Sequence, residues 1–133
     1  IGKIRDKDYY EEIKKDIDGA QIIYKGEVGF EEKIKLYQGA KGLLFPILWE
    51  EPFGLVMIEA MSCGTPVIAY SKGAVSEVLI NNKTGYVVEN YSQMIDKINK
   101  IDQINRRDCR KHVEDNFTIK KMVDGYEKAL LSI

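Results

Sequence analysis

Two glutamates on either side of a Phe-Gly pair are the residues of this sequence whose types and spacing best suit chemistry. Glu51 and Glu59 are separated by seven residues, and Phe53-Gly54 lies between them. Glu59 falls within the apolar run 55–61, where burying a carboxylate costs free energy unless it is paired or hydrogen-bonded. An ionised carboxylate only accepts hydrogen bonds, so the two side chains are suited to binding the vicinal hydroxyls of a ribose or a hexose.

The segment between the two glutamates predicts an anion site. An apolar strand at Leu43–Ile47 is followed by the loop Pro52-Phe53-Gly54 and then by a helix over Gly54–Cys63. The first turn of a helix carries unpaired amide groups and partial positive charge, and a glycine lets a ligand approach the backbone. A phosphate cradle flanked by hydroxyl-binding acids matches the ribose, diphosphate and sugar of a nucleotide sugar. The residue types alone also allow an explanation without a ligand site, in which Pro52-Phe53-Gly54 is an ordinary loop and Glu59 lies on a solvated helix face.

Four apolar segments rich in β-branched and aromatic residues are predicted to be the strands that position this loop. They cover Gln21–Lys25, Leu43–Ile47, Val67–Tyr70 and Tyr86–Val88. Their nearly continuous hydrophobicity is typical of parallel strands that are covered on both faces. Helical periodicity is expected over 9–17, 30–37, 54–63, 74–80 and in the tail. The alternation predicts an α/β fold, a doubly wound Rossmann-like parallel sheet sandwiched by helices.

Two helices of the tail carry apolar stripes. Ser92 is the expected cap of the first helix, whose stripe consists of Met94, Ile98 and Ile101. Thr118 is the expected N-cap of the last helix, with Phe117 stapled onto Met122. The expected buried face of the last helix is made of Ile119, Met122, Val123, Tyr126 and Leu130. We expect these helices to pack on the sheet or on a neighbouring domain.

The bulk composition excludes several classes of protein. The 133 residues are 44% hydrophobic and 31% charged, with a net charge of −1, which fits one compact domain. Nothing predicts nucleic-acid binding, which usually needs a basic excess, and no apolar run reaches the ~20 residues that cross a bilayer. Cys63 and Cys109 match no metal or redox spacing and are expected to be reduced thiols of a cytoplasmic protein. The start at Ile1 leads us to expect a fragment of a longer chain.

With the pair Glu51 and Glu59, the sequence resembles the retaining glycosyltransferases of family 4, and more broadly the glycogen and starch synthases that share their donor domain. The hallmark of this family is two glutamates separated by seven residues around a Phe-Gly. The other elements that fit in order are Tyr24-Lys25-Gly26-Glu27-Val28, Leu36-Tyr37-Gln38-Gly39-Ala40-Lys41, Ala60-Met61, Gly64, Pro66-Val67-Ile68-Ala69, Gly73, Glu77 and Thr84-Gly85-Tyr86-Val87-Val88. The resemblance is close up to about Val88 and looser in the helical tail.

The resemblance implies the C-terminal half of a GT-B type enzyme, in which two Rossmann-like domains face each other across a cleft. Residues 1–133 would form the nucleotide-sugar-binding domain, incomplete on its N-terminal side, with the acceptor domain absent. By similarity, Glu51 is the catalytic candidate that holds hydroxyls of the transferred sugar near its reacting carbon, and Glu59 holds the ribose hydroxyls. The remaining donor-binding candidates are the backbone amides of Phe53, Gly54 and Leu55 at the sugar and phosphates, and Val28 and Lys33 near the nucleobase.

The same resemblance sets expectations for the reaction. The family places an Arg and a Lys on the diphosphate, after a first strand that this chain lacks, so we expect the chain alone not to catalyse transfer. The full enzyme is expected to use a UDP- or GDP-type donor and to retain the anomeric configuration, by positioning and by stabilising the leaving diphosphate. No metal and no cofactor are implied, because the nucleotide sugar is a substrate. The expected acceptor is a sugar, glycan or lipid bound through the missing domain, and a peripheral membrane contact of the whole protein is left open.

Single side chains carry further expectations. Glu50 is expected to be solvated, and Trp49 to pack under the loop rather than line a sugar pocket. His112 is expected to be a surface residue. A solvated helix face is expected for the basic cluster Arg106, Arg107, Arg110 and Lys111.

Three other functions compete with a transferase. The first is one half of a sugar-nucleotide epimerase on the same scaffold, and the second is a degenerate, non-catalytic nucleotide-sugar-binding or interaction module. The third is a dinucleotide oxidoreductase, which is disfavoured because no Gly-x-Gly-x-x-Gly opens a helix after a strand. The donor base, the sugar and the acceptor are not determined by the sequence.

Overall fold

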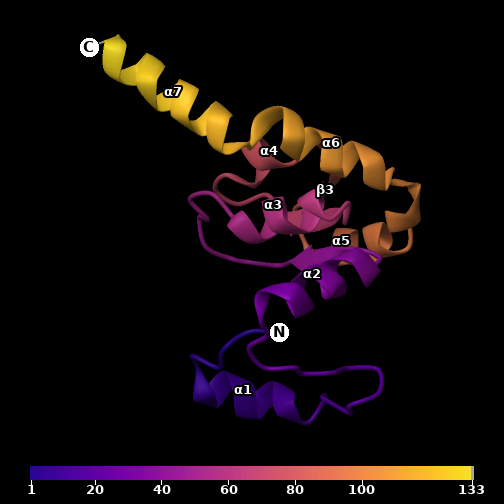
Figure 1. Ribbon diagram of the computed structural model, residues 1–133. Helices are drawn as coiled ribbons and strands as arrows, with labels where there is room; N and C mark the ends of the chain where they lie inside the picture. The colour runs from indigo at the N-terminus through magenta and orange to yellow at the C-terminus, as the bar shows by residue number, and fades with distance from the viewer. Residues whose placement is uncertain (133) are drawn as a thin grey trace. The chain divides into compact units, whose positions relative to one another are not determined.

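A computed structural model describes residues 1–132, and the chain divides into two compact units, Ile1–Lys35 and Leu36–Ile133. Each unit is described by itself. The element order is that of an α/β protein, with the strands confined to the second unit (Figure 1).

The first unit contains helix α1 (Lys7–Lys14) and the start of helix α2 (Phe30–Gly39). Asp6 caps α1 by accepting a hydrogen bond from the amide of Tyr9 at 2.9 Å. The rings of Tyr10 and Tyr24 lie 5.4 Å apart, and the Tyr24 hydroxyl donates to the carbonyl of Gly2 at 2.7 Å. The helix predicted over 9–17 is present as α1, and the helix predicted over 30–37 is present as α2, each with shifted ends.

The predicted strand Gln21–Lys25 is wrong. The segment forms a turn and loop, because one carboxylate oxygen of Asp18 accepts the amides of Ala20, Gln21 and Ile22, each at 2.8 Å. These hydrogen bonds lower the pKa of Asp18 below its ordinary value and use amides that a strand would give to a neighbour. Ile22 and Ile23 are more than half exposed, at 52% and 56%, so the apolar pattern does not mark a covered strand.

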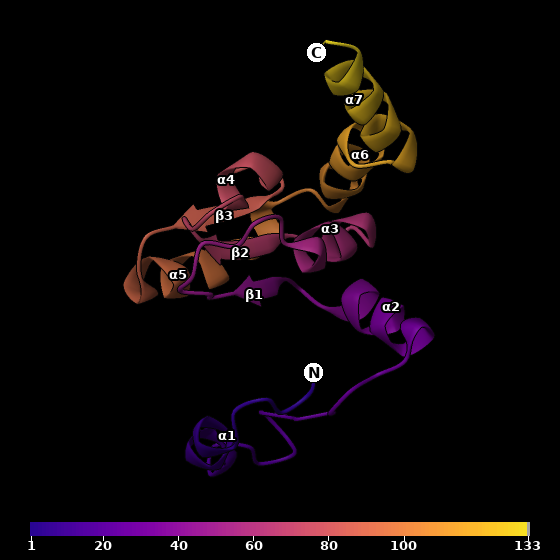
Figure 2. The ribbon, with the colours of Figure 1, turned by 90° about the vertical axis from the view of Figure 1, so that its left-hand side faces the viewer.

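The second unit is built on a three-stranded parallel sheet in the order β1 (Leu43–Phe45), β2 (Val67–Tyr70) and β3 (Gly85–Val88). This confirms the Rossmann-like parallel layer, and Figure 2 shows the three strands side by side. In the register, Leu44 is opposite Ile68, and Ile68 is opposite Tyr86. Strand β1 ends before the predicted Ile47, and the residue that follows it, Pro46, has no amide hydrogen to donate to a ladder.

Helices pack around the sheet and enclose the core. Helix α3 (Leu55–Ser62) contacts β1 and β2, helix α5 (Tyr91–Ile98) contacts β2 and β3, and helix α6 (Arg106–Asn116) packs on α3. The short helices are α4 (Val75–Val78) and the 3₁₀ helix η1 (Ile101–Gln103). Fully buried apolar side chains come from α3, β2, α4 and β3, among them Met57, Met61, Val67, Ile68, Val75, Val78 and Val88. Strand β2 is buried on both faces, as its continuous apolar sequence predicts.

The tail departs from prediction at two points. The cap of α5 is Asn90, whose side chain accepts the amide of Gln93 at 3.0 Å, so Ser92 lies inside the helix. Thr118 caps helix α7 (Ile119–Leu131) as predicted, by accepting the amide of Lys121 at 3.2 Å. The predicted buried face of α7 is not covered by this chain, because all its members are exposed: Ile119, Met122, Val123, Tyr126 and Leu130. The expectation that this face packs on the sheet is therefore wrong, and packing on a neighbouring domain stays a prediction. The amphipathic stripe exists, but it does not pack on the sheet.

Both cysteines are free thiols, but they differ in accessibility. Cys109 is fully buried, and burial raises the pKa of its thiol to about 11, whereas Cys63 is half-buried. At pH 8 a pKa of 11 leaves about one thiolate in a thousand, and the thiolate is the reactive form. We therefore expect Ellman's reagent at pH 8 to modify Cys63 alone in the folded protein and Cys109 only after denaturant is added. A Cys63→Ser variant that still reacts without denaturant would contradict this.

Candidate functional site

The predicted anion site lies at the N-terminus of α3. Gly54 is the N-cap residue, with φ 79° and ψ 56°, and the helix proper begins at Leu55. This left-handed conformation is accessible to glycine at little cost, which explains the residue type at the cap. Glycine has no side chain with which to cap the helix, and unpaired amides in a first turn suit an acceptor such as a phosphate.

Glu51 folds back over the loop that leads into α3. Its Oε1 accepts a hydrogen bond from the amide of Gly54 at 3.1 Å, and its Oε2 accepts one from the indole of Trp49 at 3.1 Å. Each carboxylate oxygen has lone pairs for more than one donor, so these contacts orient Glu51 and leave it able to accept sugar hydroxyls. Trp49 is 62% exposed, so the expectation that it packs under the loop is wrong, and it instead borders Glu51 at the surface.

A second loop, between β2 and α4, holds the backbone on which Glu51 sits. The amide of Ala74 donates to the carbonyl of Glu51 at 2.8 Å, and the amide of Gly73 donates to the carboxylate of Glu50. Glu50 is exposed as expected, but it also fastens the two loops together, which a simply solvated side chain would not do.

Glu59 is half-buried in α3, which excludes a simply solvated side chain. The hydroxyl of Tyr37 donates a hydrogen bond to its Oε2 at 3.3 Å. Tyr37 is 9% exposed, and burial, followed by the charge of Glu59, raises the pKa of its hydroxyl to about 12. Glu59 lies five residues after Gly54, which places it about 7.5 Å further along the helix axis, since an α-helix rises 1.5 Å per residue.

The structure thus gathers part of the predicted site around one helix. Glu51, Phe53, Gly54, Leu55 and Glu59 all lie in the second unit, on α3 or the loop before it. Val28 and Lys33 belong to the first unit, where both are half-buried, Val28 just before α2 and Lys33 within it. Their approach to the other site residues stays a prediction.

Sequence reasoning gave no functional role to Tyr37 or to the Gly73 loop. Tyr37 could have been noticed as a hydroxyl-bearing residue on the expected buried face of a helix, where its hydroxyl needs a partner. The contact of the Gly73 loop with Glu50 joins residues 23 positions apart and had no local signal.

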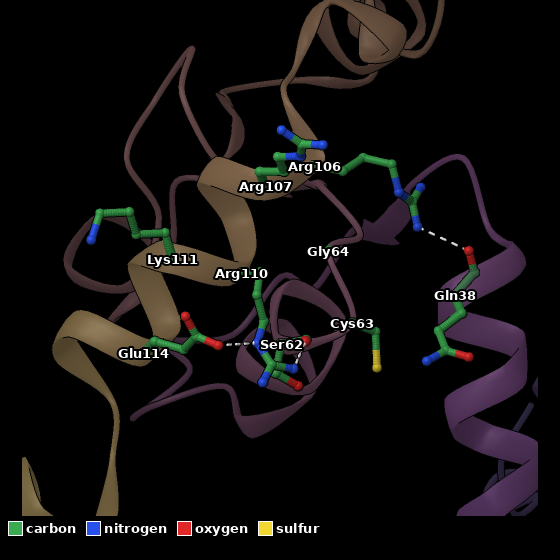
Figure 3. A pocket seen from close by; sticks show the side chains of 9 residues that line it. All are labelled: Gln38, Ser62, Cys63, Gly64, Arg106, Arg107, Arg110, Lys111 and Glu114. Atoms are coloured by element: carbon green, nitrogen blue, oxygen red, sulfur yellow. Dashed lines mark hydrogen bonds and ion pairs between the residues drawn. The ribbon is translucent and has the colours of Figure 1, made fainter.

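The basic cluster on α6 lies at the other end of α3, and all four of its residues are exposed, as expected. It borders a surface cavity of about 530 Å³ together with Gln38, Ser62 and Cys63. Arg106 donates to the carbonyls of Ala40 at 2.7 Å and Gln38 at 3.0 Å, and Arg110 donates to the carbonyl of Ser62 at 2.6 Å. Figure 3 shows these two arginines reaching in different directions, and Lys111 pointing away from both. The two arginines therefore cap the C-terminal ends of α2 and α3.

His112 is also more than a surface residue. Its Nε2 lies 2.9 Å from the carbonyl of Val78, and its ring packs edge-on against Phe117 with 5.3 Å between centroids. It thereby links α6 to the end of α4.

Neither a metal centre nor a membrane span is found among residues 1–132. No group of three or more His, Cys, Asp or Glu side chains in this range is placed to hold a metal ion. No helix in it combines the length and the hydropathy that crossing a bilayer requires.

The comparisons with known proteins agree on one family. The sequence model of the family described as "Glycosyl transferases group 1" matches residues 1–116. N-acetyl-alpha-D-glucosaminyl L-malate synthase of Bacillus anthracis is 28% identical over 108 residues, which are 75% of this chain and 28% of that protein. "Uncharacterized glycosyltransferase MJ1607" of Methanocaldococcus jannaschii is 35% identical over 65 residues, 49% of this chain and 16% of that protein.

Solved structures share the fold. The crystal structure of Anabaena Alr3699/HepE in complex with UDP and glucose superimposes with a TM-score of 0.82 at 20% identity, over 99% of this chain and 39% of that one. The C-terminal domain of LpcC, a glycosyl transferase group 1 family protein from Francisella tularensis, superimposes with a TM-score of 0.67 at 26% identity, over 86% of this chain and 65% of that one. The chain thus spans less than two-thirds of each of these proteins.

Proposed function

This chain belongs to the glycosyl transferases group 1 family, and from this premise we propose that it holds the nucleotide-sugar donor of a sugar-transfer reaction at the start of α3. One observation carries the proposal: Glu51 accepts the amide of Gly54, the cap residue of α3, and Glu59 is half-buried further along the same helix. A helix start binds phosphate, and carboxylates accept hydrogen bonds from hydroxyls. The helix start is therefore suited to the diphosphate of a nucleotide sugar, Glu51 to its sugar and Glu59 to its ribose.

Each candidate residue takes one part of the donor. The amides of Phe53 and Leu55 would bind the diphosphate and the sugar, while the Gly54 amide donates to Glu51 and so holds this carboxylate for the hydroxyls of the transferred sugar. Glu59 would bind the ribose. Val28 and Lys33 would lie near the nucleobase. The donor is proposed to be of the UDP type first and of the GDP type second, because the similar Anabaena protein is solved with UDP and with UDP-glucose.

The reaction is proposed to proceed without a metal and without a resident cofactor. Transfer with retention would depend on the positioning of the donor and on stabilisation of the leaving diphosphate, to which the first turn of α3 contributes its amides. The acceptor would bind through another part of the longer protein, and this chain by itself would not turn over donor. Steady sugar transfer or donor hydrolysis by the isolated chain would refute this last point.

The proposal is tested by calorimetric titration of the chain with UDP, UDP-glucose, GDP and GDP-mannose. We expect the chain to prefer ligands of one base. Glu59→Gln should weaken the binding of the nucleoside diphosphate and of the nucleotide sugar of that base to the same extent. A hydrogen bond to a charged group contributes about 1.5–3 kcal/mol, so the loss should be roughly ten- to hundredfold. Glu51→Gln should weaken the diphosphate sugar more than the diphosphate, because the sugar hydroxyls are absent from the latter.

The matched control is Glu127→Gln, which makes the same chemical change at an exposed position of α7 and should leave all affinities unchanged. Thermal unfolding of each variant shows whether the fold is kept. Equal affinities in the wild type and in both site variants, or no binding by a folded wild type, would contradict the proposed donor site. The absence of binding would favour a degenerate interaction module, whereas inversion of a sugar hydroxyl by the longer protein would favour the epimerase.

A further inference from the structure

We infer that Tyr37 is a positioning residue for the ribose-binding carboxylate: its hydroxyl holds Glu59 in the orientation that accepts the ribose diol. The inference rests on the proposed function, because it assigns a helper to the residue that binds ribose there. Tyr37 lies in the last turns of α2, and Glu59 lies in the middle of α3, so the contact joins two helices.

The contact fits this role in its chemistry. The Tyr37 hydroxyl donates to Oε2 of Glu59 at 3.3 Å in a partly buried place, and the tyrosine side chain is 9% exposed. Because burial and the charge of Glu59 raise the pKa of this hydroxyl to about 12, it stays protonated and can donate at every physiological pH. The separation is longer than the usual ~2.7–2.8 Å of a hydroxyl hydrogen bond, so we expect an effect at the modest end of the range.

Tyr37 is itself held from two sides through its backbone. The hydroxyl of the fully buried Thr65 donates to the carbonyl of Tyr37. Arg106 donates to Thr65 Oγ1 at 3.1 Å and to the carbonyls of Gln38 and Ala40, the residue after Tyr37 and the one that follows α2. Figure 3 shows Arg106 extended toward Gln38. These hydrogen bonds hold the backbone at the end of α2, and thereby the position from which the Tyr37 side chain extends toward Glu59.

A fixed carboxylate matters because ribose offers two adjacent hydroxyls. Two hydrogen bonds form together only if both oxygens of the carboxylate face the diol, and a glutamate has three side-chain torsions to restrict. A hydrogen bond that sets this orientation before the ligand arrives removes an ordering cost from binding. Tyr37 should therefore add to affinity only for ligands that carry both ribose hydroxyls.

The test uses Tyr37→Phe, which removes the hydroxyl and keeps the ring. The affinities of wild type and variant for UDP and for 2′-deoxy-UDP are measured by calorimetry, with the corresponding guanine pair if GDP is the preferred base. We expect Tyr37→Phe to weaken UDP about three- to tenfold and to change 2′-deoxy-UDP by less than about twofold. The preference for ribose over deoxyribose should therefore shrink, which a loss of general stability would not cause.

The double variant Tyr37→Phe/Glu59→Gln separates positioning from independent contact. If Tyr37 acts through Glu59, the double variant binds UDP no more weakly than Glu59→Gln alone, because coupled residues are not additive. The inference would be overturned if the loss of UDP affinity in the double variant equalled the product of the losses in the two single variants. It would also be overturned if Tyr37→Phe weakened UDP and 2′-deoxy-UDP equally. If Tyr37→Phe folds poorly, it is measured in a Gly125→Ala background, since that glycine has open space around it in α7 and gains helix stability as alanine.

Two failures are distinguishable. If Glu59→Gln weakens UDP and Tyr37→Phe does not, the positioning role is wrong and the donor site stands. If Glu59→Gln itself leaves UDP binding unchanged, the donor site is wrong and the role of Tyr37 falls with it.

Discussion

Replacing Gly85 with alanine is expected to destabilise the second unit by about 4 kcal/mol or more, a large part of the ~5–15 kcal/mol that stabilises a typical domain. Gly85 begins β3 and pairs with Val67 of β2. A Cβ atom at this position would lie 1.9 Å from the carbonyl oxygen of Val67 and 2.9 Å from its carbonyl carbon and its nitrogen. These are backbone atoms of the central strand, so they cannot move aside without separating the sheet.

The comparison that isolates this clash is Gly125→Ala in α7, where an added Cβ meets nothing within 4 Å. An alanine inside a helix is expected to stabilise the protein by about 0.5–1 kcal/mol relative to glycine, so the two substitutions should have opposite signs. Both are measured by urea unfolding followed by circular dichroism. A Gly85→Ala variant within about 1 kcal/mol of the wild type would show that the strands do not approach each other as described.

The sheet could be predicted because its signal is carried within each strand. Val67–Tyr70 was predicted with its observed limits, and Tyr86–Val88 lacks only Gly85. Continuous apolar runs in a short segment are found where both faces are covered, and here helices α3 and α5 contact the central strand β2. The loop and helix after Leu43–Ile47 followed from the same local pattern.

The errors came where a distant or competing partner decides the structure. The run Gln21–Lys25 has the composition of a strand, but the Asp18 carboxylate takes three of the nearby amides. The stripe of α7 has the right period, yet periodicity states which residues share a face and not what covers that face. Asn90 displaced Ser92 as a cap because both residue types suit the position and only the geometry of the turn selects between them.

The placement of the two acids relative to α3 could be predicted from the sequence, but the contacts of these acids could not. The spacing of Glu51 and Glu59 around Gly54 placed one acid before the helix and one inside it, as the structure has them. The hydrogen-bond partners of the two acids differ in how far away they lie in the sequence. Trp49 is two residues from Glu51, whereas Tyr37 is 22 residues from Glu59, so the second contact depends on how α2 packs near α3.

Gly73→Ala is expected to displace Glu51 and to weaken binding of the diphosphate sugar at least about tenfold, while the sheet remains folded. Gly73 has φ +53°, and a Cβ there would lie 2.2 Å from the carbonyl oxygen of Glu51 and 2.5 Å from its nitrogen. The two loops would have to separate, which removes the hydrogen bonds from Ala74 to the Glu51 carbonyl and from Gly73 to the Glu50 carboxylate. Glu51 would then no longer be held over the Gly54 amide.

The matched control is Gly19→Ala, because Gly19 also has a positive φ, +71°, but an added Cβ meets nothing within 4 Å. Both variants suffer the strain of alanine in a left-handed conformation, about 1–2 kcal/mol, and only Gly73→Ala adds the clash with the Glu51 backbone. Affinity for the diphosphate sugar should therefore fall in Gly73→Ala and stay unchanged in Gly19→Ala, by calorimetry on folded samples. If Gly73→Ala bound the sugar donor as tightly as the wild type, the position of Glu51 would not be set by this loop, and the chain would have to hold its catalytic candidate through Trp49 and Gly54 alone.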